Sequence, residues 1–500
     1  MTLQTYLYRC LLRTLPLWAV GGFTACQLEE TPYSSIAVNQ FYKTAEDAEA
    51  ALQAVYGSVG DLYAGPAPLM VSDFSADQVY PRPVVGRDTY TLFSYDPEYS
   101  AARSFNRANE SPLHIWQQCY SGIEKANLVI ANVPAILMNP ARRDQIVGEA
   151  SFLRAFFYWT LTKNFGDVVL KTDPSTTEVT ATAPQVPAAQ VYEQIYRDLE
   201  TAAASLPSGP AGIQAGRPSK EAALGLHAKA ALYGENWQVA LQKAQEVIGG
   251  GYSLLPDVRD VYNPDREAAA RVENLFAFES DNTNPGRTSQ IMGLYGPANG
   301  AAPAYGSATF GSIFAYPAFY ASFDPADKRR QLLDTNYVNR TGQTVPQRSI
   351  TPITPRGVLV KKYQDPASVG GNTRANIPIL RLADVYLVAA EAAARLNGPT
   401  GQAYEYLNVV RRRAGLPDLA PDLDANAFLN AVLQERSWEL FSEGDRWYDL
   451  TRTNTFLSVI PRAVNDVFPV RNPQPRHRYF PIPADEIAAN PAVSQAPGWN

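Results

Sequence analysis

The fold is decided by a segment that reads IPILRLADVYLVAAEAAARLNG at 377–398, AYEYLNVVRRRAGLP at 403–417 and ERSWELFSEGDRWYDLTR at 435–452. Apolar residues recur in it at intervals of three and four, as is typical of amphipathic helices. A break at Gly398 divides the first two parts. The spacing therefore predicts a pair of helices joined by a short turn within 379–414.

An earlier part of the chain repeats this pattern. Helices are predicted over 218–234 and 237–248, with a tight turn at Glu235 and Asn236 between them. Both helices carry alanines, which allow close approach. Two helix-turn-helix units of this kind predict the architecture of a tetratricopeptide repeat protein.

Further helices are predicted over 44–63, 111–135, 142–165 and 188–206. The first has Thr44 as a capping residue and one apolar stripe, formed by Ala48, Ala51, Leu52, Val55, Val59 and Leu62. Another apolar face, formed by Ile146, Ala150, Leu153, Phe157 and Leu161, ends at Gly166, a residue type suited to a helix C-terminus. A short strand is expected at 168–170.

Two long segments, 64–110 and 251–376, have no sustained periodicity and are rich in Gly, Pro and Tyr. The most irregular part lies at 284–311. Long irregular segments within a compact protein are usually functional or disordered, and the aromatic content argues against disorder. These segments are therefore the expected location of a binding site.

The N-terminus has the features of an export signal. Arg9 and Arg13 precede a short apolar run that ends in small residues before Cys26. This pattern predicts a signal peptide at 1–25 and a lipid anchor on Cys26, with an ordinary secretory signal as the alternative. Loss of the two arginines would change the net charge from −6 to −8.

Composition excludes some classes of function. The chain of 500 residues has 46% hydrophobic and 18% charged residues, as in globular proteins, and its net charge of −6 argues against nucleic-acid binding. The basic run at 411–413 is explained by the end of a helix, where cations are favourable. After export and lipidation only Cys119 is left among the cysteines, so no internal disulfide is expected.

Common catalytic and cofactor motifs are missing from the sequence. The three histidines are far apart and stand in no zinc-binding pattern, and there is no nucleophile elbow, P-loop or dinucleotide fingerprint. Cys119 lies in an apolar helical segment, which favours a buried thiol over a nucleophile. We expect no cofactor and no metal.

One acidic cluster has two possible interpretations, a catalytic site or a structural network of ion pairs. Paired carboxylates one helical turn apart could serve glycoside hydrolysis. Arginines interleaved with them, however, favour an ion-paired network that keeps the acids ionised and inert. The acids are Glu435, Glu439, Glu443, Asp445 and Asp449, and the arginines are Arg436, Arg446 and Arg452.

Several segments together resemble the SusD/RagB family of outer-membrane nutrient-uptake lipoproteins. They occur in the family's order and cover both ends and much of the middle of the chain. They are Cys26 with Glu29 and Glu30, FYKTAEDAEAALQAVY, WQQCYSGIEKANLVIANV, GEASFLRAFFYWTLTKNFGDVVL, FYASFDPADKRR, IPILRLADVYLVAAEA, ERSWELFSEGDRWYDLTR and the closing YFPIPADEIAANP.

The resemblance implies a mostly α fold of tetratricopeptide-like helix pairs, with a loop-rich ligand lobe and few short strands. In residues 26–500 the scaffold would lie mainly at 44–63, 111–250 and 377–452, and the lobe mainly at 64–110 and 251–376.

The implied function is non-catalytic. A lipoprotein held at the outer membrane by Cys26 would capture an oligosaccharide, or a peptide, for a SusC-like TonB-dependent transporter. Gln27 and Leu28 displace the acids that follow the cysteine, a departure that weakens the expected exposure at the cell exterior. A surface hydrolase and a ligand-free tetratricopeptide scaffold remain alternatives.

Sugar rings bind through aromatic platforms flanked by polar groups. The two irregular segments offer both, although packing alone also explains single tyrosines. The candidate ligand-binding residues are Asp73, Asp77, Tyr80, Arg87, Tyr90, Tyr95, Tyr99, Tyr295, Asn299 and Tyr305.

Overall fold

The computed structural model describes most of the chain from residue 41 onward. The described residues are 41–84, 86–100, 108–174, 182–284, 287–289, 291–347 and 357–499. The predicted lipidation site Cys26 and the signal peptide at 1–25 lie outside them.

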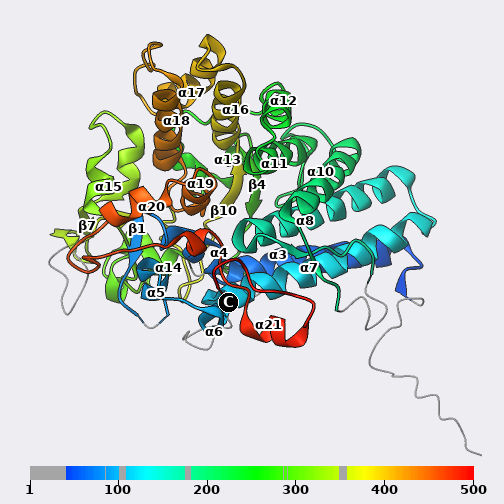
Figure 1. Cartoon of the computed structure of the whole chain (residues 1–500). Coiled ribbons are helices and arrows are strands. Elements are labelled where there is room, and N and C mark those ends of the chain that lie inside the picture. Colours follow the sequence, from blue (N-terminus) through cyan, green and yellow to red (C-terminus); the bar gives the residue numbers. More distant parts are fainter. Residues whose placement is uncertain are drawn as a thin grey trace, which may run out of the picture. The chain divides into compact units, whose positions relative to one another are not determined.

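The first scaffold helices agree with the sequence pattern. Helix α3 (Ala45–Ala64) begins at Thr44, whose hydroxyl accepts a hydrogen bond from the backbone N–H of Asp47 in a capping box. All six apolar residues of its predicted stripe are buried. Helix α7 (Pro112–Asn132) packs between α3 and α8 (Pro140–Phe165), and α8 in turn packs on α10 (Ala188–Ser205) (Figure 1).

Helix α8 is buried more completely than its predicted single apolar face requires. Nearly every residue from Gly148 to Thr162 is inaccessible to solvent, because helices pack around it from several sides. Gly166 ends the helix with a φ of 77°, a backbone conformation that favours glycine.

The two predicted helix pairs are present. Helices α11 (Lys220–Tyr233) and α12 (Trp237–Ile248) form the first pair, and α16 (Leu382–Asn397) and α17 (Gly401–Arg413) form the second. Helix α12 packs against α16, so the two pairs stack although they are far apart in the sequence (Figure 1). This stacking is the tetratricopeptide-like arrangement that the sequence predicts.

The chain ends with α18 (Ala425–Glu439), α19 (Arg446–Arg452) and a mostly irregular tail that docks back onto the body. Buried Arg471 holds the tail by donating hydrogen bonds to the carbonyls of Thr91, Phe74, Ser75 and Ala76.

Strands among the described residues are short and pair only in twos, all antiparallel. They are β1 (Val79–Pro81) with β5 (Ile313–Ala315), β2 (Val168–Val169) with β3 (Gln185–Val186), β4 (Asn274–Phe278) with β10 (Ile377–Arg381), β6 (Leu333–Asp334) with β9 (Leu359–Val360), and β7 (Asn336–Val338) with β8 (Thr344–Pro346).

Segment 251–376 is more structured than its lack of periodicity suggests. It carries six of these strands and several single-turn helices, including η3 (Val258–Val261), η6 (Pro303–Tyr305), α14 (Ile291–Tyr295), α15 (Pro317–Ala321) and η7 (Lys328–Leu332). Elements this short give no detectable period. None of the described helices is both long and apolar enough to cross a membrane.

Candidate functional site

The acidic cluster of the C-terminal helices lies inside the protein. The side chains of Glu435, Glu439, Glu443, Asp445 and Asp449 are at most 7% exposed. Each lies within ion-pair distance of at least one Arg or Lys. A substrate cannot reach carboxylates placed in this way.

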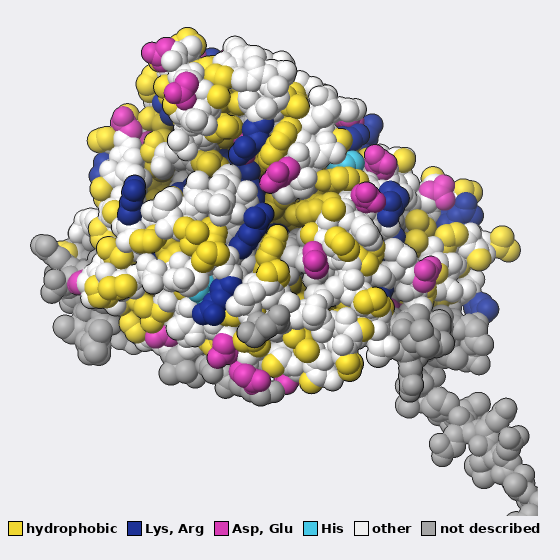
Figure 2. All heavy atoms as spheres, in the orientation of Figure 1, with side chains coloured by type: hydrophobic (Ala, Val, Ile, Leu, Met, Phe, Trp, Pro, Cys, Tyr) yellow, Lys and Arg dark blue, Asp and Glu magenta, His cyan; other side chains and the backbone are white. Residues whose placement is uncertain are grey.

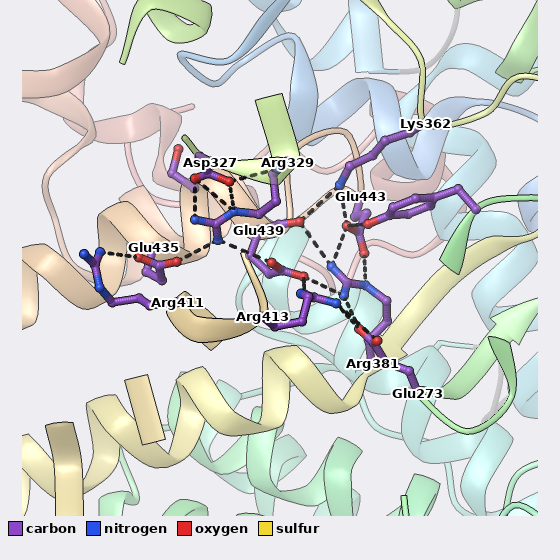
Figure 3. Close-up of polar contacts among 12 residues, drawn as sticks. Glu273, Asp327, Arg329, Lys362, Arg381, Arg411, Arg413, Glu435, Glu439 and Glu443 are labelled. Atoms are coloured by element: carbon purple, nitrogen blue, oxygen red, sulfur yellow. Dashed lines mark hydrogen bonds and ion pairs between the residues drawn. The ribbon is translucent and has the colours of Figure 1, made fainter. Parts of the chain in front are cut away.

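Glu439 lies at the centre of this network (Figure 3). One of its oxygens accepts hydrogen bonds from Arg413 and, at 2.8 Å, from Arg381. The other lies 3.3 Å from Arg329. Glu435 extends the network, since it lies 2.7 Å from the same Arg329.

Glu443 closes the network on the other side (Figure 3). It accepts hydrogen bonds from Lys362 at 2.6 Å, from Tyr262 at 2.7 Å and from Arg381 at 2.8 Å. The cations therefore come from four separate segments of the chain, and they join segment 251–376 to the helical scaffold.

The pKa values agree with a structural role. Burial alone would raise the pKa of Glu439, but the neighbouring Arg413, Arg381 and Arg329 hold it well below the usual range. Burial likewise favours a higher pKa for Glu443, but Arg381 and Lys362 outweigh it, so this pKa is lowered as well. Both carboxylates stay ionised, so neither is poised to donate a proton in catalysis.

The predicted arginine partners are correct only in part. Arg436 and Arg452 do pair with Asp449, at 2.8 and 2.7 Å. Arg446 instead lies 2.7 Å from Asp77, and the glutamates take their partners from outside their own helix. The basic run at 411–413 lies in the last helical turn as expected, but Arg411 and Arg413 also reach into the network.

A groove of about 790 Å³ opens directly beside this network. Tyr262, Asp327 and Lys362 belong to both, so the ion pairs hold the floor of the groove in place. All residues that line the groove come from 251–376, and they include Arg259, Asn263, Asp265, Tyr320, Arg330, Gln331, Asp334, Lys361 and Gln364.

Two tyrosines line the groove, and of these Tyr262 is buried whereas Tyr320 presents part of its ring. It lies near the end of the short helix α15 and is half-buried, and it also lines a second cavity of about 460 Å³. The guanidinium carbon of Arg330 lies 4.5 Å from the centre of its ring. Such stacking fixes the orientation of a long, flexible side chain.

The short helix η7 explains why two neighbouring arginines have opposite roles. Asp327 caps this helix, and successive residues of a helix with three residues per turn point in different directions. Arg329 is completely buried and pairs with Asp327 at 2.7 Å. Arg330 points to the groove.

The six tyrosines predicted to bind ligand do not present a ring surface in this structure. Tyr80, Tyr90, Tyr95, Tyr99, Tyr295 and Tyr305 are each at most 5% exposed. Tyr90, Tyr95 and Tyr99 come together, with ring centroids 5.7 to 6.3 Å apart, but as part of a core beneath the C-terminal tail. In this structure the six rings are packed in the interior, and their role in ligand binding stays a prediction.

The polar candidates are also engaged elsewhere, with one exception. Buried Asp73 accepts a hydrogen bond from Tyr295 at 3.4 Å, and burial raises its pKa to about 7. Arg87 pairs with Glu110 at 2.6 Å, and Asp77 pairs with Arg446 as described above. Asn299 alone is exposed, in a left-handed backbone conformation with a φ of 63°.

Sequence reasoning did not single out Tyr320, Arg330, Gln331 or Gln364. Their signal is the stretch FYASFDPADKRRQ at 319–331, in which an aromatic pair, an Asp-Pro turn and a basic run follow one another. The sequence shows the order of these residue types. The direction of each side chain, however, depends on the packing of Asp327 and Arg329 against distant parts of the chain.

Metal-ligating side chains and thiols point to no further site among the described residues. Basic and acidic side chains are interspersed with hydrophobic ones on the described part of the face shown in Figure 2. No group of three His, Cys, Asp or Glu side chains among the described residues could hold a metal ion. Cys119 is buried, and burial raises the pKa of its thiol.

Two sequence-family profiles match this chain. The profile described as the SusD family matches residues 257–499, and a second, described as starch-binding and associating with the outer membrane, matches 28–232. A SusD-like protein of Formosa agariphila is 28% identical over 95% of both chains. A SusD-like protein of Bacteroides ovatus is 24% identical over 89% of this chain and 82% of its own.

Solved structures share the fold. A laminarin-binding SusD-like protein superposes with a TM-score of 0.76 at 24% identity, over 91% of this chain and all of its own. Surface glycan-binding protein A of Bacteroides thetaiotaomicron, in complex with laminarihexaose, has a TM-score of 0.75 at 23% identity, over 91% of this chain and 100% of that one.

Proposed function

The chain belongs to the SusD family, and from this premise we propose that it captures an oligosaccharide in the groove beside Tyr320. It acts without breaking bonds and passes the sugar to a SusC-like TonB-dependent transporter. Two relatives of the same fold are described as binding laminarin or laminarihexaose, which supports a glycan as the ligand class.

The observation that carries the proposal is the composition of the groove. Its volume of about 790 Å³ suits several sugar units, and half-buried Tyr320 offers an apolar ring. The amides of Asn263, Gln331 and Gln364 line the same space and can hydrogen-bond to ring hydroxyls. This combination of one ring with several amides is what a sugar requires.

Replacing Tyr320 with Ala is expected to weaken glycan binding about 10- to 100-fold, because the variant loses the apolar contact with the sugar face. A panel of neutral and acidic oligosaccharides and peptides is first screened with the purified protein. Laminarihexaose is included in the panel because a structural relative binds it. Isothermal titration then compares wild type and variant on each ligand that binds.

The matched control is Tyr386→Ala. Tyr386 is also half-buried, but it lies on α16 and outside the groove. The Tyr386→Ala variant should bind each ligand with the same Kd as the wild-type protein. Equal binding by Tyr320→Ala and wild type would place the ligand elsewhere. If only the peptides of the panel bind, the ligand is a peptide and the proposal of a glycan ligand is wrong.

We further propose that residues 1–25 are a signal peptide and that Cys26 carries the lipid that holds the protein at the outer membrane. A Cys26→Ala variant is expected to leave the membrane fraction and to lose co-purification with the transporter from detergent extracts. The control is Cys119→Ala, which changes a buried thiol and should remain with the membrane. Membrane association of the Cys26→Ala variant would argue for a different anchor.

A further inference from the structure

Four basic side chains line the groove, and they differ in whether an acidic residue pairs with them. Of the basic side chains that line it, three already pair with an acid. Arg259 lies 2.5 Å from Asp257, Lys361 lies 3.5 Å from Asp334, and Lys362 lies 2.6 Å from Glu443.

Arg330 differs from these three. Among the residues that the structure describes, its guanidinium has no hydrogen-bond or ion-pair partner, and its Nε is buried without an acceptor. A buried donor left without an acceptor is unfavourable, and a guanidinium binds planar oxyanions best through paired N–H groups. Its contact with Tyr320 holds the side chain at the groove, where a ligand can reach it.

The acids that line the groove are, by contrast, all occupied. Asp265 lies 3.0 Å from Arg374, Asp327 lies 2.7 Å from Arg329, and Asp334 pairs with Lys361. A ligand that enters the groove therefore meets one guanidinium without an ion-pair partner and, among the described residues that line the groove, no carboxylate without one. An anionic group would be attracted here, whereas a neutral hydroxyl could accept a hydrogen bond from the guanidinium but would leave its charge uncompensated.

We propose that the groove selects an acidic oligosaccharide, with Arg330 binding the carboxylate of a uronic acid or a sulfate ester while Tyr320 stacks on a neighbouring ring. This inference rests on the proposed function and specifies its ligand class. A carboxylate and a sulfate ester can each present two oxygens that share negative charge to the paired N–H groups of a guanidinium.

The test compares oligosaccharides of one length. Hexagalacturonate carries carboxylates, a carrageenan hexasaccharide carries sulfates, and laminarihexaose is neutral. At least one acidic probe is expected to bind the wild-type protein about tenfold or more tightly than the neutral probe. Arg330→Gln should weaken that acidic probe about 10- to 100-fold and leave neutral binding within about twofold, since one charged hydrogen-bonding group is lost.

Two further variants separate specific recognition from general charge. Arg266→Gln removes the same formal charge from an exposed arginine outside the groove lining, paired with Asp260 at 3.4 Å, and should leave every affinity unchanged. Arg330→Lys keeps the charge but loses the planar pair of donors, so its affinity should lie between wild type and Arg330→Gln.

The outcomes are distinct. Equal affinity for neutral and acidic probes, or an Arg330→Gln variant that binds the acidic probe like wild type, overturns the acidic ligand while leaving glycan capture intact. If no oligosaccharide binds, glycan capture itself fails, and the inference fails with it. Preference for the carboxylate or the sulfate probe identifies which anion the groove accepts.

Discussion

Replacing Arg413 with Met is expected to lower the free energy of unfolding by about 3–5 kcal/mol, because two buried carboxylates each lose one of their counter-charges and share the remaining arginines. The side chain of Arg413 is 5% exposed, and it pairs with Glu273 and Glu439, whose side chains are not exposed at all. Methionine fills much of the same volume, so the loss reflects charge rather than a cavity. Urea denaturation followed by circular dichroism measures it.

The adjacent residue supplies the control. Arg412 lies in the same turn of α17, but its side chain is 48% exposed and its partners Glu405 and Asp418 face solvent. Arg412→Met should therefore change stability by no more than about 1 kcal/mol. Similar losses in the two variants would mean that the buried network does not support the fold.

The same network bears on the hydrolase alternative, which a double variant can test. If Glu435 and Glu439 were catalytic, Gln at both positions would abolish turnover while leaving the fold intact. Their burial among Arg329, Arg381 and Arg413 predicts the opposite, a loss of stability. The denaturation midpoint of this double variant distinguishes the two.

Acidification from about pH 5 to about pH 2 is expected to remove roughly 3 kcal/mol of stability through Glu391 alone. Burial by itself would raise the pKa of this carboxyl. Arg452, which donates two hydrogen bonds of 2.7 Å to it, and Arg395 outweigh burial and lower the pKa from 4.5 to about 2. A lowered pKa contributes stability that is present above the unfolded value of 4.5. It is lost as the pH falls through 4.5 toward 2.

Glu391→Gln removes this titration. The variant should be less stable than wild type at neutral pH, and its stability should fall less steeply over the same acid range. Denaturation midpoints across a pH series give both quantities. An unchanged slope in Glu391→Gln would show that Glu391 titrates normally in the folded protein.

Local patterns in the sequence were sufficient to predict the scaffold. The Thr44 cap, the stripe of α3, the Gly166 terminus and the two helix pairs all follow from spacing within a few residues. Stacking of α12 on α16 joins segments separated by more than 130 positions, and it could be expected only from the repeat architecture.

The site was harder to predict, for a physical reason. Tyrosine has an apolar ring and a polar hydroxyl, so the same residue type serves a core or a wet surface, and its sequence position does not distinguish them. Tyr90 is buried with its hydroxyl bonded to the carbonyl of Glu110, whereas Tyr320 remains half-buried beside an open groove. Similarly, only tertiary contacts send Arg329 inward and Arg330 outward.

The pairing of β4 with β10 has a consequence for how the segment between these strands can vary. Residue 278 lies opposite Ile377, so the chain leaves the scaffold and returns to it at the same place. All of the groove except the part at 259–265 is built from the intervening chain. The entropic cost of closing a loop grows only slowly with its length. Insertions between these strands are thus tolerated more readily than insertions in the helices, so the groove can change shape and composition while the scaffold is preserved.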